Sequence, residues 1–434
     1  MSSSVSLLLL GVSLLVAGCA AGMRGVAVRS AESGDTDGAL RAYREFRERD
    51  GDDASLLGLI AVHYLTNEAI SAPDAAERNA AVRALIRGGT RGVDGVHRVA
   101  AEGAGLARAL ALEQMSRLGA RCARASVAAM ASEGDPELRA LGVRSLNDRT
   151  QLVAALQDIA PVVRIAAIRA QRAQGTPENF VRGWSEVARM DPAPGVRVTA
   201  LRALGAAAVG LEAAIRGLED EVESVRLAAA EAAVDIDAQR GWLAVQGLFQ
   251  SETNRPAIAA CRARLRSPGP EADAAEAYLV GALQAQDSTL RLMAVSALRG
   301  ANGSLAWRPE FERRLREETD VQVRLTLALV LAEPPEEGPG AVEALRELAA
   351  AEAGEELVAL QAALALERFG LGGGIERILA SRESPNSTVR AGAYAGLARA
   401  IERPDLAFQG LEDIDARVRI RTAGAILGLA SHRD

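Results

Sequence analysis

Lysine is absent from this 434-residue sequence, and all 50 of its basic residues are arginine. Acidic residues number 57, so the formal net charge at pH 7 is −7. This acidic balance argues against nucleic acid as the main ligand, because binding to a phosphate backbone needs a basic face. Arginine is always charged and carries a planar fork of donors, which suits bidentate pairing with carboxylates.

Aromatic residues and cysteines are also scarce. Aromatic side chains make up 3% of the chain against 49% hydrophobic residues, so the core has to be built mainly from alanine, leucine and valine. The three cysteines, Cys19, Cys122 and Cys261, form no CxxC pair, which excludes a disulfide scaffold. Cys122 and Cys261 lie among alanines in predicted helices, and we expect both to be buried free thiols.

The sequence also lacks the short motifs that mark common catalytic and cofactor sites. It has no GxSxG, no phosphate-binding loop and no Rossmann fingerprint. Its three histidines, His63, His97 and His432, have no HExxH context and no cysteine or carboxylate at metal-ligand spacing. We therefore expect surface or packed structural histidines, no metal, no cofactor and no enzymatic activity.

Residues 1–18 are typical of an export signal. An apolar run over 5–17 has the length of a signal-peptide core and is too short to span a bilayer. It ends in Leu15-Val16-Ala17-Gly18-Cys19, which resembles the lipobox of bacterial lipoproteins. The resemblance implies that Cys19 is lipidated, that 19–30 is a lipidated N-terminus and short tether, and that the chain is anchored to the outer membrane facing the periplasm. No basic residue precedes the run, which departs from that pattern, and an ordinary signal peptide is the alternative.

A short pattern of the form VRLAAAEAA recurs from about residue 70 to the end of the chain. Its copies align on Arg78, Arg139, Arg164, Arg197, Arg226, Arg291, Arg324, Arg390 and Arg419, with weaker copies at Ala107, Arg255 and Val358. Eleven steps lead from Arg78 to Arg419, a mean period of 31 residues. A period of this length is typical of a solenoid.

Each repeat has the pattern of two helices joined by a polar turn. In 205–236, apolar residues at helical spacing predict a first helix over 211–218 and a second over 225–236. Asp135-Pro136 and Asp191-Pro192 each place an acid before proline, which predicts an N-cap followed by the first helical residue. The pattern at this period resembles bacterial HEAT-like repeats. The resemblance implies an all-α, right-handed α-α superhelix of about twelve hairpins over 70–434.

An aspartate often precedes the repeat arginine. The offset is four residues at Asp135, Asp287, Asp320 and Asp415, and six at Asp158, Asp191 and Asp220. We predict that the aspartate caps its helix and pairs with an arginine of its own or the adjacent repeat, which fixes the angle between repeats. The alternative is that the arginine row binds an acidic peptide or anionic lipid. Its members are Arg139, Arg164, Arg197, Arg226, Arg291, Arg324, Arg390 and Arg419.

Two segments interrupt the repeat pattern. Residues 31–69 resemble parts of tetratricopeptide units, and we interpret them as a helical cap of that type or as a divergent hairpin. The loop 333–340 carries three prolines and three glutamates. It is either a partner-binding insertion or a solvated linker.

These features favour a non-enzymatic, membrane-anchored periplasmic scaffold or adaptor that binds protein partners through its repeat surface. The membrane contact is the N-terminal lipid, and no nucleic acid or small-molecule substrate is expected. One alternative is a subunit of an envelope-assembly, secretion or motility complex. The other is a HEAT-like enzyme of the lyase or glycosylase type, which the scarcity of candidate catalytic residues disfavours.

Overall fold

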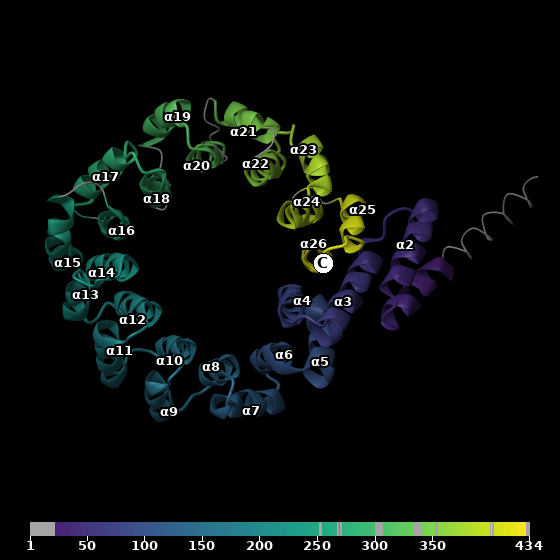
Figure 1. Ribbon diagram of the computed structural model, residues 1–434, viewed down its shortest axis with the longest axis horizontal. Coiled ribbons are helices and arrows are strands. Elements are labelled where there is room, and N and C mark those ends of the chain that lie inside the picture. Colours follow the sequence, from purple (N-terminus) through teal and green to yellow (C-terminus); the bar gives the residue numbers. More distant parts are fainter. Residues whose placement is uncertain are drawn as a thin grey trace, which may run out of the picture. The chain divides into compact units, whose positions relative to one another are not determined.

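The computed structural model describes residues 22–430 except 251–253, 267–268, 270, 300–306, 334–339, 352–354, 400 and 402. Within these residues the regular structure is helical and contains no strand (Figure 1). The predicted all-α fold is therefore confirmed. Among the same residues, no helix combines the length and the apolar character needed to cross a bilayer.

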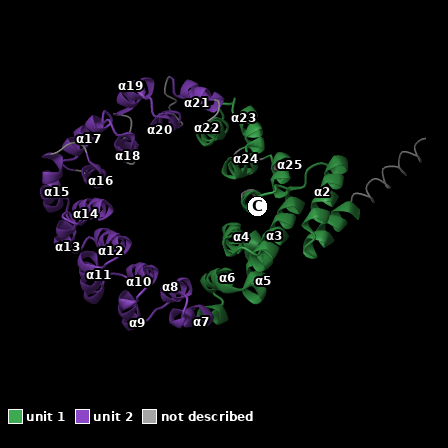
Figure 2. Ribbon diagram, in the orientation of Figure 1, with its two compact units in different colours: residues 1–124, 352–434 green, residues 125–351 purple. Residues whose placement is uncertain are grey.

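The chain divides into two compact units, shown in Figure 2. Unit 1 combines residues 1–124 with 352–434, and unit 2 comprises 125–351. Unit 1 contains a helix over 22–32, α2 (Thr36–Asp50), α3 (Ala54–Ser71), α4 (Ala75–Arg87), α5 (Val93–Glu102), α6 (Gly105–Arg117), α22 (Glu356–Arg368), α23 (Ile375–Ala380), α24 (Ser387–Arg399), α25 (Pro404–Ala407) and α26 (Ala416–Ala430).

The boundary between the units falls within α7 (Arg121–Ala129). Unit 2 continues with α8 (Pro136–Arg144), α9 (Arg149–Ala154), α10 (Pro161–Ala173), α11 (Glu178–Met190), α12 (Pro194–Ala206), α13 (Leu211–Gly217), α14 (Glu223–Ile236), α15 (Ala238–Val245), α16 (Arg255–Arg264), α17 (Glu271–Ala282), α18 (Ser288–Arg299), α19 (Arg308–Glu317), α20 (Val321–Leu331) and α21 (Ala341–Ala350).

Within each unit the helices form two layers. Successive even-numbered helices pack on one another, as α8, α10, α12, α14 and α16 do in unit 2, and α10, α12, α14 and α16 each also pack on the odd-numbered helix before them. All twelve aligned repeat positions, from Arg78 in α4 to Arg419 in α26, lie in even-numbered helices. The predicted array of about twelve HEAT-like hairpins is confirmed, and it runs from α3–α4 to α25–α26.

The predicted boundary between cap and array, at residue 69, falls inside α3. This helix packs on α4, so the first hairpin begins at Ala54. Only α2 and the helix over 22–32 precede the array within the described residues.

Aspartates start several of the helices. Asp135 is the N-cap of α8, where its carboxylate accepts hydrogen bonds from the backbone amides of Glu137 and Leu138, with Pro136 in the first turn. The same prediction for Asp191-Pro192 is wrong. There α12 begins at Pro194, with Ala193 as its N-cap. The Asp191 carboxylate instead accepts hydrogen bonds from the backbone amide of Ala193 and from the guanidinium of Arg164 in the preceding hairpin.

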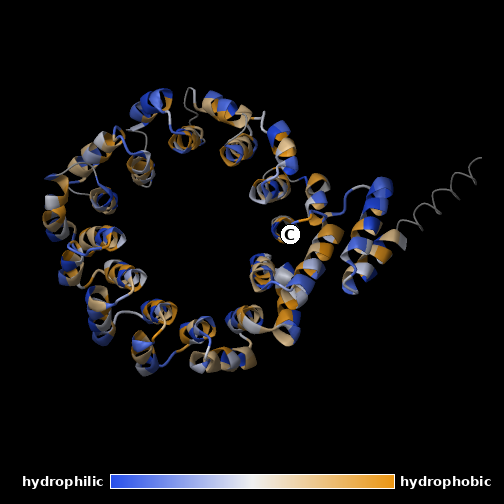
Figure 3. Cartoon of the chain, viewed as in Figure 1, coloured by the Kyte–Doolittle hydropathy of each residue, from blue (hydrophilic) through white to orange (hydrophobic). Residues whose placement is uncertain are grey.

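Small residues allow the helices to approach closely. In α14, Val225, Ala229 and Ala232 are buried. A Cβ added at Gly205 of α12 would lie 3.1 Å from the Cα of Ala232, closer than side chains normally pack. Among the odd-numbered helices, α19 is largely hydrophilic in Figure 3. Alanine and glycine therefore set the spacing of the even-numbered layer.

In unit 1, the last even-numbered helix packs on the first hairpin. Helix α26 lies against α3 and α4 (Figure 1). A Cβ added at Gly424 of α26 would lie 3.0 Å from the Cβ of Ala84 in α4, as close as the contact between α12 and α14. The ring of Tyr43 in α2 also meets that of Phe408 edge-on, at a centroid distance of 5.7 Å. The two ends of the repeat array are thus joined by the same kind of contact that joins neighbouring repeats.

Candidate functional site

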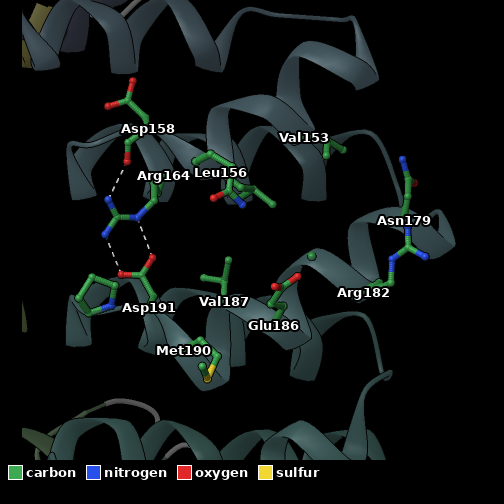
Figure 4. Close-up of a pocket in the computed structure, with 13 residues that line it drawn as sticks. Val153, Leu156, Asp158, Arg164, Asn179, Arg182, Glu186, Val187, Met190 and Asp191 are labelled. Atoms are coloured by element: carbon green, nitrogen blue, oxygen red, sulfur yellow. Dashed lines mark hydrogen bonds and ion pairs between the residues drawn. The ribbon is translucent and has the colours of Figure 1, made fainter.

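The repeat arginines form hydrogen-bonded rungs between hairpins, and Arg164 shows the geometry most clearly (Figure 4). Its Nε and Nη2 donate to the two carboxylate oxygens of Asp191 in the next hairpin, each at 2.7 Å. Its Nη1 donates to the backbone carbonyls of Asp158 and Ile159 in the turn of its own hairpin, at 2.7 and 3.1 Å. The guanidinium therefore connects the turn of its own hairpin to the turn of the next hairpin.

The same bidentate pairing recurs along the array. In unit 2, Nε and Nη2 of Arg139 lie 3.0 Å from the Asp158 carboxylate, and those of Arg197 lie 2.8 Å from Asp220. Arg291 pairs with Glu318 at 2.9 and 2.7 Å. In unit 1, Arg390 pairs with Asp413 at 2.8 and 3.0 Å. We call these four pairs, together with Arg164–Asp191, the arginine ladder.

The two offsets between aspartate and arginine correspond to two different roles. Asp158, Asp191 and Asp220, six residues before an arginine, bind the arginine of the preceding hairpin and accept a backbone amide two residues further on. The aspartates at an offset of four accept backbone amides at the start of their helices. These are Asp135, Asp287, Asp320 and Asp415.

Three predicted rungs differ from this pattern. Arg226 donates to the carbonyls of Asp220 and Glu221 in its own turn. Arg324 forms an exposed pair with Glu347. Arg419, in the last hairpin, donates from Nε to the hydroxyl oxygen of Tyr64 in α3, at 3.1 Å.

Four of the partners in these contacts are not among the residues that the sequence pattern predicts. Glu318 and Asp413 lie six residues before Arg324 and Arg419, so the offset alone was a sufficient signal for both. Glu347 lies in α21 outside the repeat motif, and Tyr64 is 355 residues from Arg419. No local pattern points to either of those two.

Pairing shifts the ionisation of the ladder groups. The hydrogen bond from Arg139 lowers the pKa of the Asp158 carboxyl, and the one from Arg390 lowers that of Asp413. The same contacts raise the pKa of each arginine. Arg164 and Asp191 are 7% and 8% exposed. The donors of these arginines are therefore already used within the chain.

A groove of about 430 Å³ lies beside the Arg164–Asp191 rung in unit 2. Figure 4 shows this rung on one side and Asn179 and Arg182 on the other. Val153 of α9 and Met190 of α11 line it, and Met190 is 66% exposed. Val153 is 36% exposed. We call Val153 and Met190 the apolar rim.

The other chemically notable residues lie apart from this groove. Cys261 is buried, which raises the pKa of its thiol to about 12. Cys122 is exposed, so the prediction that it is buried is wrong. It lies on an outward position of α7, because the buried positions of that helix are taken by Ala123 and Val127.

His63 lines a second pocket in unit 1, and burial lowers its pKa. No group of three or more histidine, cysteine or acidic residues with the geometry to hold a metal ion occurs in the part of the chain that the structure describes. Cys19 and His432 lie outside the described residues, as does 334–339 of the proline-rich loop.

Similarity to known proteins is found among solved structures. No protein-family model matches the chain. No curated protein matches it either. Among solved structures, the chain is similar to human deoxyhypusine hydroxylase in complex with glycerol, with 19% identity, a TM-score of 0.26, and coverage of 70% of this chain and 99% of that chain. The assignment to the HEAT-like fold rests on the hairpins, layers and ladder described above.

Proposed function

We propose that this chain is a non-enzymatic, membrane-anchored periplasmic scaffold or adaptor that binds protein partners through its repeat surface. The observation that carries the proposal is the apolar rim beside the unit 2 groove. Exposed apolar side chains that gather beside a recess, with charged residues around them, are typical of protein-binding surfaces. The ladder supports the same interpretation, because its arginines hold the array together and leave the surface between them for binding.

The groove has the features of a site for an apolar anchor from a partner protein. Val153, Val187 and Met190 supply apolar surface, and Arg182 and Glu186 supply charges of both signs at its edge. Binding energy at protein interfaces is concentrated in a few such anchors surrounded by polar contacts. We expect the partner to insert an apolar side chain here.

A variant pair tests this surface. The partner would first be identified by cross-linking in envelopes, then purified and titrated against the wild-type chain, Met190→Glu and Leu243→Glu. Leu243, in α15, is 59% exposed and is not a lining residue of the groove, so it is a matched control. We expect Met190→Glu to weaken binding by roughly tenfold or more. Equal affinities of the two variants would rule out the groove as the binding surface.

The anchor requires a separate test, because Cys19 lies outside the described residues. Cells expressing the wild-type chain or Cys19→Ser would be labelled with radioactive palmitate. We expect the label in the wild type alone. Label in both chains, or in neither, contradicts the lipid anchor and with it the periplasmic location.

A further inference from the structure

Five arginines that do not belong to the ladder line one pocket in unit 1. Arg83 and Arg87 come from α4, Arg399 from the end of α24, and Arg417 and Arg421 from α26. The pocket has a volume of about 590 Å³, and Glu77 is the one carboxylate among its described lining residues. We call it the arginine pocket.

The arrangement arises from helix periodicity and from the packing of the last helix on the first hairpin. Arg83 and Arg87 are four residues apart on α4, and Arg417 and Arg421 are four apart on α26, so each pair lies on one helix face. Like charges at this spacing destabilise a helix. The packing of α26 on α4 brings the two pairs to one pocket and adds to that repulsion.

The chain does not neutralise these charges as it does in the ladder. Within the described part of the chain, none of the five guanidiniums lies at ion-pair distance from a carboxylate. Arg399 donates from Nη2 to the carbonyl of Gly424, at 3.3 Å. Burial, together with the charges of Arg87 and Arg421, lowers the pKa of Arg399, whereas pairing raises the pKa of ladder arginines.

We propose that the arginine pocket binds a compact anion that carries phosphate groups, of the pyrophosphate class. The guanidinium fork matches phosphate oxygens in bidentate geometry. Five guanidiniums and one carboxylate give a net charge of +4. One phosphate group carries about −1.5 to −2 charges at pH 7, so two adjacent groups balance most of it. The volume lies in the usual range for small-ligand sites, about 300–1,000 Å³.

An acidic peptide is a poorer match for the pocket. Its carboxylates carry single charges, and successive side chains of an extended segment are about 3.3 Å apart along the chain and point to opposite sides. The five arginines converge from three helices on one small volume. This arrangement favours a ligand whose charge is concentrated.

Calorimetric titration of the full-length chain with inorganic pyrophosphate tests the proposal. The variants are Arg87→Ala/Arg421→Ala and, as a control with the same change in net charge, Arg169→Ala/Arg202→Ala, two exposed arginines of unit 2 outside any pocket described above. We expect the pocket variant to lose affinity by roughly tenfold or more per arginine, and the control to bind as the wild type does. No binding to the wild type, or equal binding by all three proteins, overturns the proposal.

Two further measurements separate binding from folding. Pyrophosphate should raise the melting temperature of the wild type and the control but not that of the pocket variant, by mass action. The pocket variant itself should melt no lower than the wild type, because the substitutions relieve repulsion between like charges. Arg421→Lys, which keeps the charge and loses the fork, should bind with intermediate affinity, and wild-type affinity in that variant contradicts bidentate recognition.

The phosphate groups could belong to a soluble molecule or to a lipid headgroup. Vesicles of cardiolipin, whose headgroup carries two phosphate groups, and of phosphatidylcholine, mixed with the Cys19→Ser chain, distinguish the sources. Cardiolipin vesicles that compete with pyrophosphate identify a headgroup site, and vesicles without effect identify a site for a soluble anion. A polyglutamate peptide that binds the pocket while pyrophosphate does not would overturn the proposal in favour of an acidic protein segment.

Discussion

Arginine has two contrasting arrangements in this chain, the paired ladder of unit 2, which continues at Arg390 in unit 1, and the arginine pocket of unit 1. In unit 2, Arg139, Arg164 and Arg197 each bind a carboxylate of the next hairpin and carbonyls of their own turn. In unit 1, five guanidiniums and one carboxylate line the arginine pocket. The difference follows from position. The ladder arginines stand at the repeat position, where an acidic residue of the next hairpin meets them, whereas the pocket arginines stand on other turns of α4, α24 and α26, where one carboxylate, Glu77, lines the pocket.

The last repeat arginine lies between these two cases. Arg419 keeps the contacts with its own turn, at 2.8 and 3.1 Å from the carbonyls of Asp413 and Ile414. No thirteenth hairpin follows within the described residues, and its Nε donates to the Tyr64 hydroxyl of α3 instead. The first hairpin thus takes the place of a following repeat, with a neutral group where the ladder has a carboxylate.

The largest effect is expected from breaking a buried rung. Asp191→Ala leaves the Arg164 guanidinium buried without its carboxylate, and we expect a loss of about 3 kcal/mol in the free energy of unfolding. The exposed pair Arg324–Glu347 is the control, and Glu347→Ala should cost no more than about 1 kcal/mol. Chemical denaturation of the three proteins measures both losses. Equal losses would show that burial does not distinguish the two pairs.

Overpacking tests whether the ends of the array are joined as tightly as its middle. Ala229→Leu in unit 2 and Ala84→Leu in unit 1 each enlarge a fully buried alanine in an even-numbered helix. We expect each to cost about 1–3 kcal/mol, against little change for Ala206→Leu, which is exposed on α12. Thermal melting measures the losses. A negligible cost for Ala84→Leu alone would mean that α26 packs loosely on α4.

The neutral last rung should contribute less than a buried ladder pair. Tyr64→Phe removes the hydroxyl that accepts the Arg419 hydrogen bond while it keeps the ring in place, and we expect a loss of about 1 kcal/mol. Denaturation of Tyr64→Phe beside Asp191→Ala measures the ratio. A loss as large as that of Asp191→Ala would place the terminal contact among the principal stabilising interactions.

The repeat and its fold could be predicted from the sequence because they depend on local spacing. The second helix of the repeat at 205–236 was predicted over 225–236 and spans 223–236, since buried alanines at helical spacing mark it directly. Each acidic residue of the ladder lies six residues before a repeat arginine. This spacing is visible in the sequence once the aspartates that lie four residues before a repeat arginine are treated as a separate group. Asp191-Pro192 misled the prediction because an acid before proline is typical of an N-cap, whereas the carboxylate is used by Arg164.

The arginine pocket and the Tyr64 contact could not be predicted in this way. Both depend on the packing of α26 on α3 and α4, helices that lie at opposite ends of the sequence. Locally, Arg83 and Arg87 are indistinguishable from a solvated helix face, and so are Arg417 and Arg421. Long-range packing, rather than any motif, brings these two faces into one pocket.

Lowering the pH tests how much the ladder carboxylates contribute to stability. Because the pKa values of Asp158 and Asp413 are lowered in the folded chain, their contribution to stability is complete above the unfolded-state pKa of about 3.9. It is lost as the pH falls through the lower, folded-state values. We expect the melting temperature to fall below about pH 4, with a shallower fall in Asp158→Asn, which has no such carboxyl to protonate. Parallel curves for the wild type and Asp158→Asn would show that this rung does not contribute to acid sensitivity, and Asp413→Asn applies the same test to unit 1.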